Sequence, residues 1–152
     1  MEFRDGSSMV DITGKPSVRR TATATGLIYL KESTIGAVRL HQVTKGDVIC
    51  VAQAAATLAI KDTPRLVAFC HQIPITAVDA NFDIEDNAIR VTITVTSIAQ
   101  TGVEMEALTG VSAALLNIWD MVKSLEKDET GNYPSTRIDE IKVLDKKKEP
   151  IQ

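Results

Sequence analysis

Apolar and polar residues alternate in two neighbouring stretches near the middle of the chain. In residues 78–84 (VDANFDI) every second side chain is apolar, and the same holds in residues 89–95 (IRVTITV). A polar segment, residues 85–88 (EDNA), separates the two stretches. A period of two places successive side chains on opposite faces of a strand. The pattern therefore predicts a β-hairpin with one buried face.

Two further strands are predicted near the ends of the chain. Residues 20–30 (RTATATGLIYL) are rich in threonine and aliphatic residues, and residues 137–145 (RIDEIKVLD) form a last strand. Residues 1–18 are polar and contain glycine and serine. We expect residues 1–18 to be a flexible N-terminal arm that orders when it meets a partner. Residues 19–148 are then a single domain.

A short helix is predicted after the first strand. Residues 32–42 (ESTIGAVRLHQ) carry Ser33 and Thr34, both good N-cap residues, near their start. Gly36 weakens this helix because glycine has a low helix propensity.

A longer helix is predicted in the alanine-rich run from Val48 to Ile60. Asp47 precedes this run and is a suitable N-cap. Pro64 follows Thr63, and proline favours the first turn of a helix. We therefore expect a new turn to start at Pro64, with a short helical piece over residues 64–69.

The order of these elements, with a second long helix over residues 103–126, is strand, helix, hairpin, helix, strand. This order predicts an α+β fold, the ferredoxin-like β-α-β-β-α-β sandwich, with an antiparallel sheet and helices on one face. One face of the sheet is then covered by helices. The other face meets solvent or a second subunit.

The predicted helix over residues 103–126 is apolar on nearly all sides. Val111, Leu115 and Ile118 fit one face, but Leu116 and Trp119 lie on others. A helix that is apolar all round is normally buried all round. This favours an oligomer in which the helix also lies at an interface. The alternative is scattered surface apolar residues, which are common in monomers.

Composition narrows the class of protein. The chain has 152 residues, of which 44% are hydrophobic and 24% charged, with a net charge of −3. This suits one globular domain and gives no overall basic field for nucleic acid or a membrane surface. Cys50 and Cys70, with no signal peptide or transmembrane run in the sequence, indicate reduced thiols and a cytoplasmic protein.

The charged residues of the long helix lie near its two ends. Glu106 and Asp120 are fourteen residues apart, which is about 21 Å along a helix. One small metabolite cannot contact both, so the two ends suit a nucleotide triphosphate or two sites completed by neighbouring subunits. Asp120 and Lys123 are adjacent on the helix surface. Spacing alone leaves open whether they are an ordinary ion pair or an acid–base pair.

Other candidates are dispersed. His71 follows Cys70 at a helix-to-strand junction, where it is either a general acid or a histidine hydrogen-bonded within a loop. Lys45 lies near a predicted helix N-terminus, which suits a phosphate group, and Lys61 ends the same helix. The cysteine and histidine spacing does not fit a zinc site, so no metal ligand is predicted.

Four motifs carry a resemblance to a known family. They are TGVEMEALTGVSAALLNIWDMVK, KGDV, the K(x)8CH run from Lys61 to His71, and R-x-A-x-A-x-G from Arg20 to Gly26. Together they closely resemble the molybdenum cofactor biosynthesis protein C family, the cyclic pyranopterin monophosphate synthases. The likeness covers roughly residues 10–147.

The resemblance implies a fold, an assembly and a reaction. The family has a ferredoxin-like fold and assembles as a homohexamer, a trimer of dimers, with active sites at subunit interfaces. It converts a cyclised dihydro-GTP to cyclic pyranopterin monophosphate and releases pyrophosphate. The expected partners are a nucleotide-derived small molecule and further copies of the chain, with no nucleic acid and no membrane. No cofactor is required, although Mg²⁺ is compatible with the triphosphate.

The resemblance also implies site residues. Three positions match catalytic residues: Asp120, Lys123 and Lys45. Nine match substrate-binding or basic positions: Phe69, Cys70, His71, Met105, Glu106, Glu104, Lys61, Arg20 and Lys146.

The chain departs from the family pattern at several positions. Asp62 stands where the family commonly has arginine, Gln72 where it has proline, and Gln53 appears where an arginine is expected. The C-terminal tail ends DKKKEPIQ and lacks the glycine-rich SGGKSG of many members. Two alternatives to an enzyme remain: a non-catalytic nucleotide-binding or regulatory ferredoxin-like oligomer, and a purely structural oligomer partner.

Overall fold

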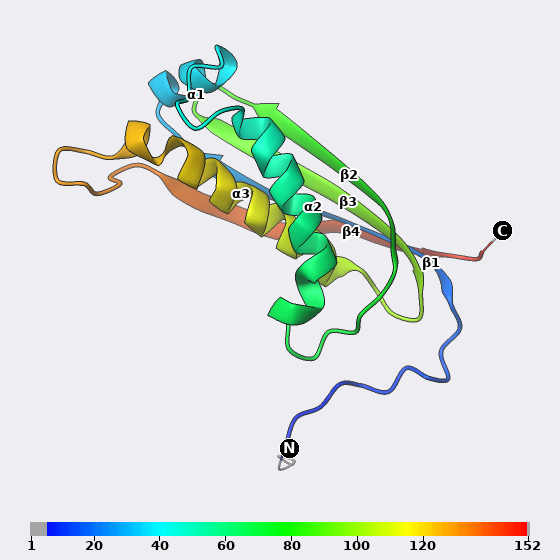
Figure 1. Cartoon of the computed structure of the whole chain (residues 1–152). Coiled ribbons are helices and arrows are strands. Elements are labelled where there is room, and N and C mark those ends of the chain that lie inside the picture. Colours follow the sequence, from blue (N-terminus) through cyan, green and yellow to red (C-terminus); the bar gives the residue numbers. More distant parts are fainter. Residues whose placement is uncertain (1–5, 152) are drawn as a thin grey trace.

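A computed structural model of the chain describes residues 6–151. Within this range the chain forms four strands and three helices. Their bounds are β1 (Val18–Tyr29), α1 (Glu32–Arg39), α2 (Val48–Leu66), β2 (Ile75–Ile84), β3 (Ala88–Ala99), α3 (Glu104–Glu126) and β4 (Arg137–Glu149). Figure 1 shows them along the chain.

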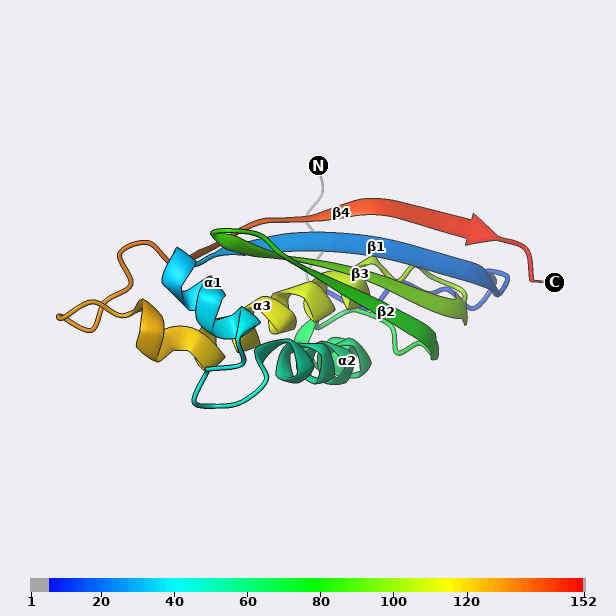
Figure 2. The ribbon, with the colours of Figure 1, turned by 90° about the horizontal axis from the view of Figure 1, so that it is seen from above.

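The strands form one antiparallel sheet in the order β2-β3-β1-β4. The long helices α2 and α3 lie on one face of this sheet, as the view from above shows (Figure 2). This is the predicted ferredoxin-like arrangement. The predicted hairpin is also confirmed, because β2 and β3 pair directly and Ile84 lies opposite Ile89. Along β3 fully buried residues alternate with half-buried ones, so one face of the hairpin packs on the core.

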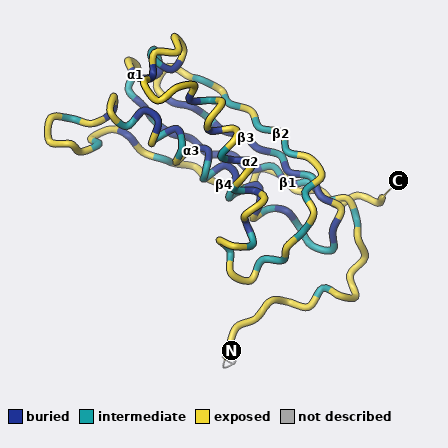
Figure 3. The backbone as a smooth tube through the Cα atoms, viewed as in Figure 1, coloured by how far each residue is buried: buried dark blue, intermediate teal, exposed yellow. Residues whose placement is uncertain are grey.

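The hydrophobic core lies between the sheet and the two long helices (Figure 3). Two glycines allow the close approach. A Cβ at Gly26 on β1 would lie 2.7 Å from the Leu115 side chain and 2.8 Å from that of Val111. A Cβ at Gly110 on α3 would lie 2.8 Å from the Ile60 side chain of α2. Helix α3 therefore sits closely against both the sheet and α2, which fixes the position of the groups at its two ends.

Asp47 is the N-cap of α2, as predicted, and its side chain accepts a hydrogen bond from the Cys50 backbone N–H at 3.0 Å. The prediction of a new turn at Pro64 was wrong, because α2 continues through this residue to Leu66. Pro64 lies in the last turn, where its missing N–H removes only one bond near the helix end. No separate helical piece follows within the described chain.

The predicted cap of the short helix was also wrong. Helix α1 starts at Glu32 and its N-cap is Lys31, which makes no side-chain capping bond. Thr34 instead donates its hydroxyl to the buried carboxylate of Glu126 at the end of α3. A buried acceptor takes the hydroxyl here because an unpaired buried carboxylate is costly.

Strand β4 is longer than predicted. It runs to Glu149, which pairs with Arg19, and so includes the lysine run 146–148. Backbone pairing does not require apolar side chains, and lysine is common on edge strands. Leu116 on α3 is 60% exposed in the single chain. Helix α3 is therefore not covered on all sides by its own chain. No helix within residues 6–151 has the length and apolar character to span a membrane.

Candidate active site

Three charged side chains meet near the C-terminal end of α3; we call Lys45, Asp120 and Lys123 the distal cluster. The Lys45 ammonium lies 2.9 Å from the Asp120 carboxylate and 3.1 Å from the Asp120 backbone carbonyl oxygen. The Lys123 ammonium lies 3.1 Å from the other oxygen of the same carboxylate. Lys45 comes from the loop between α1 and α2, so this loop and α3 build the cluster together.

The distal cluster has more positive than negative charge, with two ammonium groups on one carboxylate. Hydrogen bonds from Lys45 and then Lys123 hold the pKa of Asp120 below its ordinary value of 3.8. Asp120 is therefore ionised at neutral pH. All three side chains are about half exposed. The cluster can accept an anion from solution, and its ammonium groups can donate protons.

A second group of candidate residues lies near the start of α3, and we call it the proximal cluster. Phe69, Cys70 and His71 follow the end of α2, and Glu104 and Met105 open α3. All five line one cavity of about 580 Å³. The side chain of Phe69 is exposed, which leaves an aromatic surface available for a ring.

Glu106 follows Met105 on α3 and contacts Cys70, so we include this buried acid in the proximal cluster. It is 1% exposed, and within the described residues its Oε2 atom has no hydrogen-bond donor. The Cys70 thiol donates to Oε1 at 3.8 Å. Burial raises the pKa of Glu106 above 4.5, and burial together with the nearby Glu106 charge raises the pKa of Cys70 above 9.0. Lys61 and Glu106 border a smaller hollow beside this cavity.

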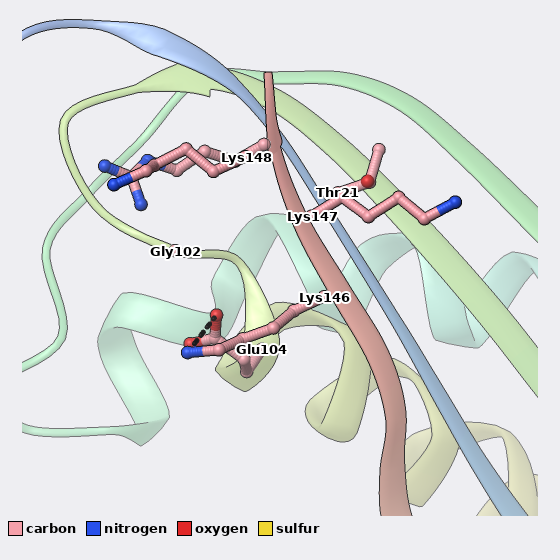
Figure 4. Close-up of a pocket in the computed structure, with 7 residues that line it drawn as sticks. Thr21, Gly102, Glu104, Lys146, Lys147 and Lys148 are labelled. Carbon is pink, nitrogen blue, oxygen red and sulfur yellow. Dashed lines mark ion pairs between the residues drawn. The ribbon is translucent and has the colours of Figure 1, made fainter.

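A smaller pocket of about 210 Å³ lies beside the proximal cluster, at the far end of β4. Figure 4 shows the Lys146 ammonium beside the Glu104 carboxylate, at 3.8 Å. Arg20 lines the same pocket, as the resemblance implies. Lys147 and Lys148 line it too, although no prediction assigned them. The sequence signal that could have identified them is the DKKKE run of residues 145–149.

The structure brings the candidate residues together in two places and not in one. The distal cluster lies near one end of α3 and the proximal cluster near the other (Figure 1). The fourteen residues between Glu106 and Asp120 correspond to about 21 Å of helix.

The departures from the family pattern lie around these clusters. Asp62 pairs with Arg65 at 3.7 Å on the exposed side of α2. Gln72 lines the hollow beside Lys61. Gln53 lies in a separate hollow with Asp47 and Cys50. None of the three forms a hydrogen bond or ion pair to the residues of either cluster among the bonds described for residues 6–151.

Cys70, His71 and Glu104 are metal-binding residue types that line one cavity, but their side chains are not arranged as a metal site. Within the described part of the chain, no group of three or more histidine, cysteine, aspartate or glutamate side chains is placed to hold a metal ion. Cys50 and Cys70 are both free thiols. The two clusters offer ammonium groups, carboxylates, an imidazole and a thiol.

Comparison with known proteins agrees with the motifs. The pattern of the MoaC family matches residues 9–149. A probable cyclic pyranopterin monophosphate synthase of Aeropyrum pernix is 57% identical over 143 residues, covering 94% of this chain and 98% of the relative. One of Archaeoglobus fulgidus is 58% identical over 140 residues, covering 92% and 90%.

A third relative, from Methanothermobacter thermautotrophicus, is named a probable cyclic pyranopterin monophosphate synthase accessory protein. It is 52% identical over 143 residues, covering 94% of this chain and 90% of the relative. The family match and these identities extend over nearly the whole length. The chain belongs to the MoaC family.

Proposed function

We propose that this chain is a cyclic pyranopterin monophosphate synthase of molybdenum cofactor biosynthesis. It converts (8S)-3′,8-cyclo-7,8-dihydroguanosine 5′-triphosphate to cyclic pyranopterin monophosphate and releases pyrophosphate. The observation that carries the proposal is the distal cluster, in which Lys45 and Lys123 enclose the Asp120 carboxylate. Relatives that are more than half identical and bear this name add support.

The distal cluster suits proton transfer during ring opening and ring closure. Opening a purine ring and closing a pterin ring require protons to move on and off nitrogen atoms, which needs placed acids and bases. In our proposal Lys123 donates or relays a proton. Asp120 stays ionised and orients Lys123 or accepts a proton, and Lys45 holds Asp120 from the other side.

The cations around Glu104 suit the phosphate chemistry. Formation of the cyclic phosphate requires a sugar hydroxyl to attack the α-phosphorus, with cleavage of the bond to the pyrophosphate group. Arg20 and Lys146 can stabilise the negative charge on the departing pyrophosphate. Mg²⁺ bound to the triphosphate would add to this stabilisation.

The proximal cluster suits recognition of the base. Phe69 offers an aromatic surface in the larger cavity. In our proposal the Oε2 atom of Glu106, at the smaller hollow and without a donor among residues 6–151, accepts a hydrogen bond from a ring N–H or amino group. His71 lines the cavity of Phe69, and Lys61 lines the hollow of Glu106. A buried acceptor without a donor favours a ligand that supplies one.

The separation of the two clusters favours an active site shared between subunits. Of the two arrangements that the span of about 21 Å allows, one extended nucleotide triphosphate or two sites shared between subunits, we favour the second, because the two clusters form separate sites in one chain. One ligand can contact both clusters if the distal cluster of one subunit faces the proximal cluster of another. Exposed Leu116 on α3 and exposed Leu144 on β4 are apolar surface that such contacts would cover. We propose the family's homohexamer as this assembly.

The test is to mix the purified protein with the cyclised dihydro-GTP and measure pyrophosphate release. Asp120→Ala is the inactive control, and its fold is checked by circular dichroism and its size by light scattering. We expect release from the wild type and none from Asp120→Ala. Substrate binding without any release, from a folded oligomer, would instead favour the non-catalytic nucleotide-binding protein.

The shared site has its own test. Asp120→Ala and His71→Ala are each expected to be inactive when pure. If subunits are exchanged by mild unfolding and refolding of a mixture, some interfaces combine an intact distal cluster with an intact proximal cluster. We then expect part of the activity to return. No recovery from demonstrably mixed oligomers would mean that each site belongs to one chain.

A further inference from the structure

Part of the N-terminal arm borders the cavity of the proximal cluster, although within residues 6–17 only Ile12 is partly buried. Val10, Ile12 and Lys15 line this cavity together with Phe69 and His71. The arm has no helix or strand over residues 6–17, so its position depends on individual contacts. Residues 1–5 lie outside the described part of the chain.

Two side chains of the domain hold the arm by its backbone. The Gln100 side chain donates from Nε2 to the carbonyl oxygen of Lys15 at 2.9 Å and to that of Thr13 at 3.4 Å. The His71 ring contacts the carbonyl oxygen of Val10, with Nε2 at 2.7 Å. These contacts join segments 61 to 87 residues apart in sequence.

The arm also has local structure of its own. The Asp11 carboxylate accepts a hydrogen bond from the Thr13 backbone N–H at 2.9 Å, and the Lys15 backbone N–H donates to the Ile12 carbonyl at 2.9 Å. Such an Asx turn followed by a β-turn reduces the number of conformations that the free arm explores. Less entropy is then lost when residues 10–15 settle on the cavity.

The contact with Val10 determines which ring nitrogen of His71 carries a proton. A carbonyl oxygen only accepts hydrogen bonds, so Nε2 of His71 must carry the proton. In the neutral ring, Nδ1 is then the nitrogen that can accept a proton or a hydrogen bond from a ligand. A backbone group that fixes a histidine in this way orients it for catalysis or binding.

Lys15 adds a positive charge to the same cavity. Within residues 6–151 its ammonium forms no ion pair with an acid, whereas Lys146, which lines the smaller neighbouring pocket, is paired with Glu104. A lysine with no acid partner on a cavity wall is suited to an anionic ligand. Neither the arm nor Gln100 is among the residues that the motif resemblance assigns.

We propose that residues 10–15 are part of the binding site, in which the Val10 carbonyl orients His71 and Lys15 contacts the anionic part of the ligand. Gln100 is the positioning residue that holds this segment in place. The proposal rests on the proposed synthase function for the identity of the ligand, a nucleotide-derived triphosphate. It does not rest on that function for the position of the arm.

The first test needs no substrate. The chain has two histidines, so a His41→Gln background leaves His71 as the only imidazole. In that background we expect a proton resonance of His71 Nε2–H that exchanges with water more slowly than the N–H of a free imidazole, because Nε2–H donates to the Val10 carbonyl. Adding Gln100→Ala should release the arm and abolish this resonance. Its absence from the His41→Gln protein, or its persistence after Gln100→Ala, would overturn the proposal.

The second test uses turnover of the cyclised dihydro-GTP. Lys15→Met should raise KM about tenfold with little change in kcat, the effect of one lost charge-assisted contact. Gln100→Ala should lower kcat roughly tenfold or more, because His71 loses its orienting partner. Lys142→Met removes the same charge from an exposed strand position outside the cavities described above and should change neither constant.

The two tests separate the possible failures. If the wild type turns over and Lys15→Met and Gln100→Ala behave like Lys142→Met, the role of the arm is wrong and the synthase function stands. If the wild type does not turn over, the synthase function fails, and the His71 resonance still decides whether the arm holds the imidazole.

Discussion

The two ends of α3 place carboxylates in opposite environments. The Asp120 side chain is 57% exposed and contacts two ammonium groups, which keep its pKa low. Glu106 is 1% exposed, has an oxygen with no donor among the described residues, and has a raised pKa. The same helix thus carries one acid whose pKa is lowered by nearby cations and one whose pKa is raised by burial.

This difference shows that the environment assigns the role of each acid. Nearby cations favour the charged form of a carboxyl group, and burial favours the neutral form. Pairs of groups whose pKa values are shifted in opposite directions are typical of acid–base sites. In our proposal the ionised Asp120 orients Lys123 at the distal end, and Glu106 contacts the ligand at the proximal end. The following variants test this division.

The largest effect is expected at the distal end. Lys123→Ala should lower turnover by about 10²–10⁴, the usual contribution of a placed general acid or base. Stability should change little, since exposed ion pairs contribute about 0–1 kcal/mol. Initial rates of pyrophosphate release and thermal unfolding measure the two effects.

The matched control for Lys123→Ala is Arg65→Ala. Arg65 and Asp62 form an exposed pair three residues apart on α2, at 3.7 Å, as Asp120 and Lys123 do on α3. Loss of this pair should leave the rate within about twofold. Equal rates in the two variants would remove the distal cluster from the mechanism.

Both ends of α3 depend on how closely its middle lies against the sheet. Gly26→Ala would bring a Cβ to 2.8 Å from the branched side chain of Val111 and 2.7 Å from that of Leu115. We expect a loss of about 1–3 kcal/mol in the free energy of unfolding, the usual cost of overpacking. Urea unfolding measures it.

The control for Gly26→Ala is a glycine substitution that should raise the free energy of unfolding. At Gly36 in α1 an added Cβ meets nothing within 4 Å. Gly36→Ala should therefore gain about 0.5–1 kcal/mol from helix propensity. A neutral Gly26→Ala would show that α3 can move away from the sheet without cost.

The sequence predicted the β-hairpin better than the ends of the individual strands and helices. The hairpin was predictable because residues 78–95 keep a period of two, a signal that tertiary structure rarely overrides. The end of β4 was not, because residues 146–148 are lysines whose backbone pairs with β1 regardless of side-chain polarity. The end of α2 was not predictable either. The destabilisation that a proline causes in a helix depends on its distance from the helix end, and Pro64 lies only two residues before Leu66.

The site was predictable as residue types but not as geometry. The motif named Lys45 and Asp120, but they are 75 residues apart in sequence, and only the fold brings them to 2.9 Å. The role of the Asp120–Lys123 pair was not predictable, because a spacing of three residues does not distinguish an ordinary surface ion pair from one that contacts a third charged residue such as Lys45. The arm gave no signal, since its contacts to His71 and Gln100 run through backbone carbonyls that carry no sequence information.

A third acid on α3 provides an internal reference for burial. Glu126 is fully buried, but its carboxylate accepts hydrogen bonds from the Thr136 hydroxyl at 2.7 Å and the Lys31 backbone N–H at 3.1 Å, and from Thr34. Glu126→Gln puts a donor where an acceptor is needed. We expect a loss of about 1–3 kcal/mol in thermal or urea unfolding. No loss would mean that these bonds are not formed in solution.

The same substitution at Glu106 should have the opposite effect on stability. Glu106→Gln keeps an acceptor for the Cys70 thiol and removes a buried charge, so it should stabilise the protein by roughly 1 kcal/mol near neutral pH. Turnover should fall, because an amide cannot supply the same charge to the ligand.

The pH dependence identifies the cause of this gain. The pKa of Glu106 in the folded protein is raised above 4.5, so its carboxyl group is protonated in both folded and unfolded chains well below that value. As pH rises through the folded pKa, the wild type loses stability and the Gln variant does not. The gain from Glu106→Gln should therefore be absent below about pH 4 and grow toward pH 8. Calorimetric melting of both proteins across this range measures it. A gain that is the same at every pH would mean that burial of charge at Glu106 is not what separates the two ends of α3.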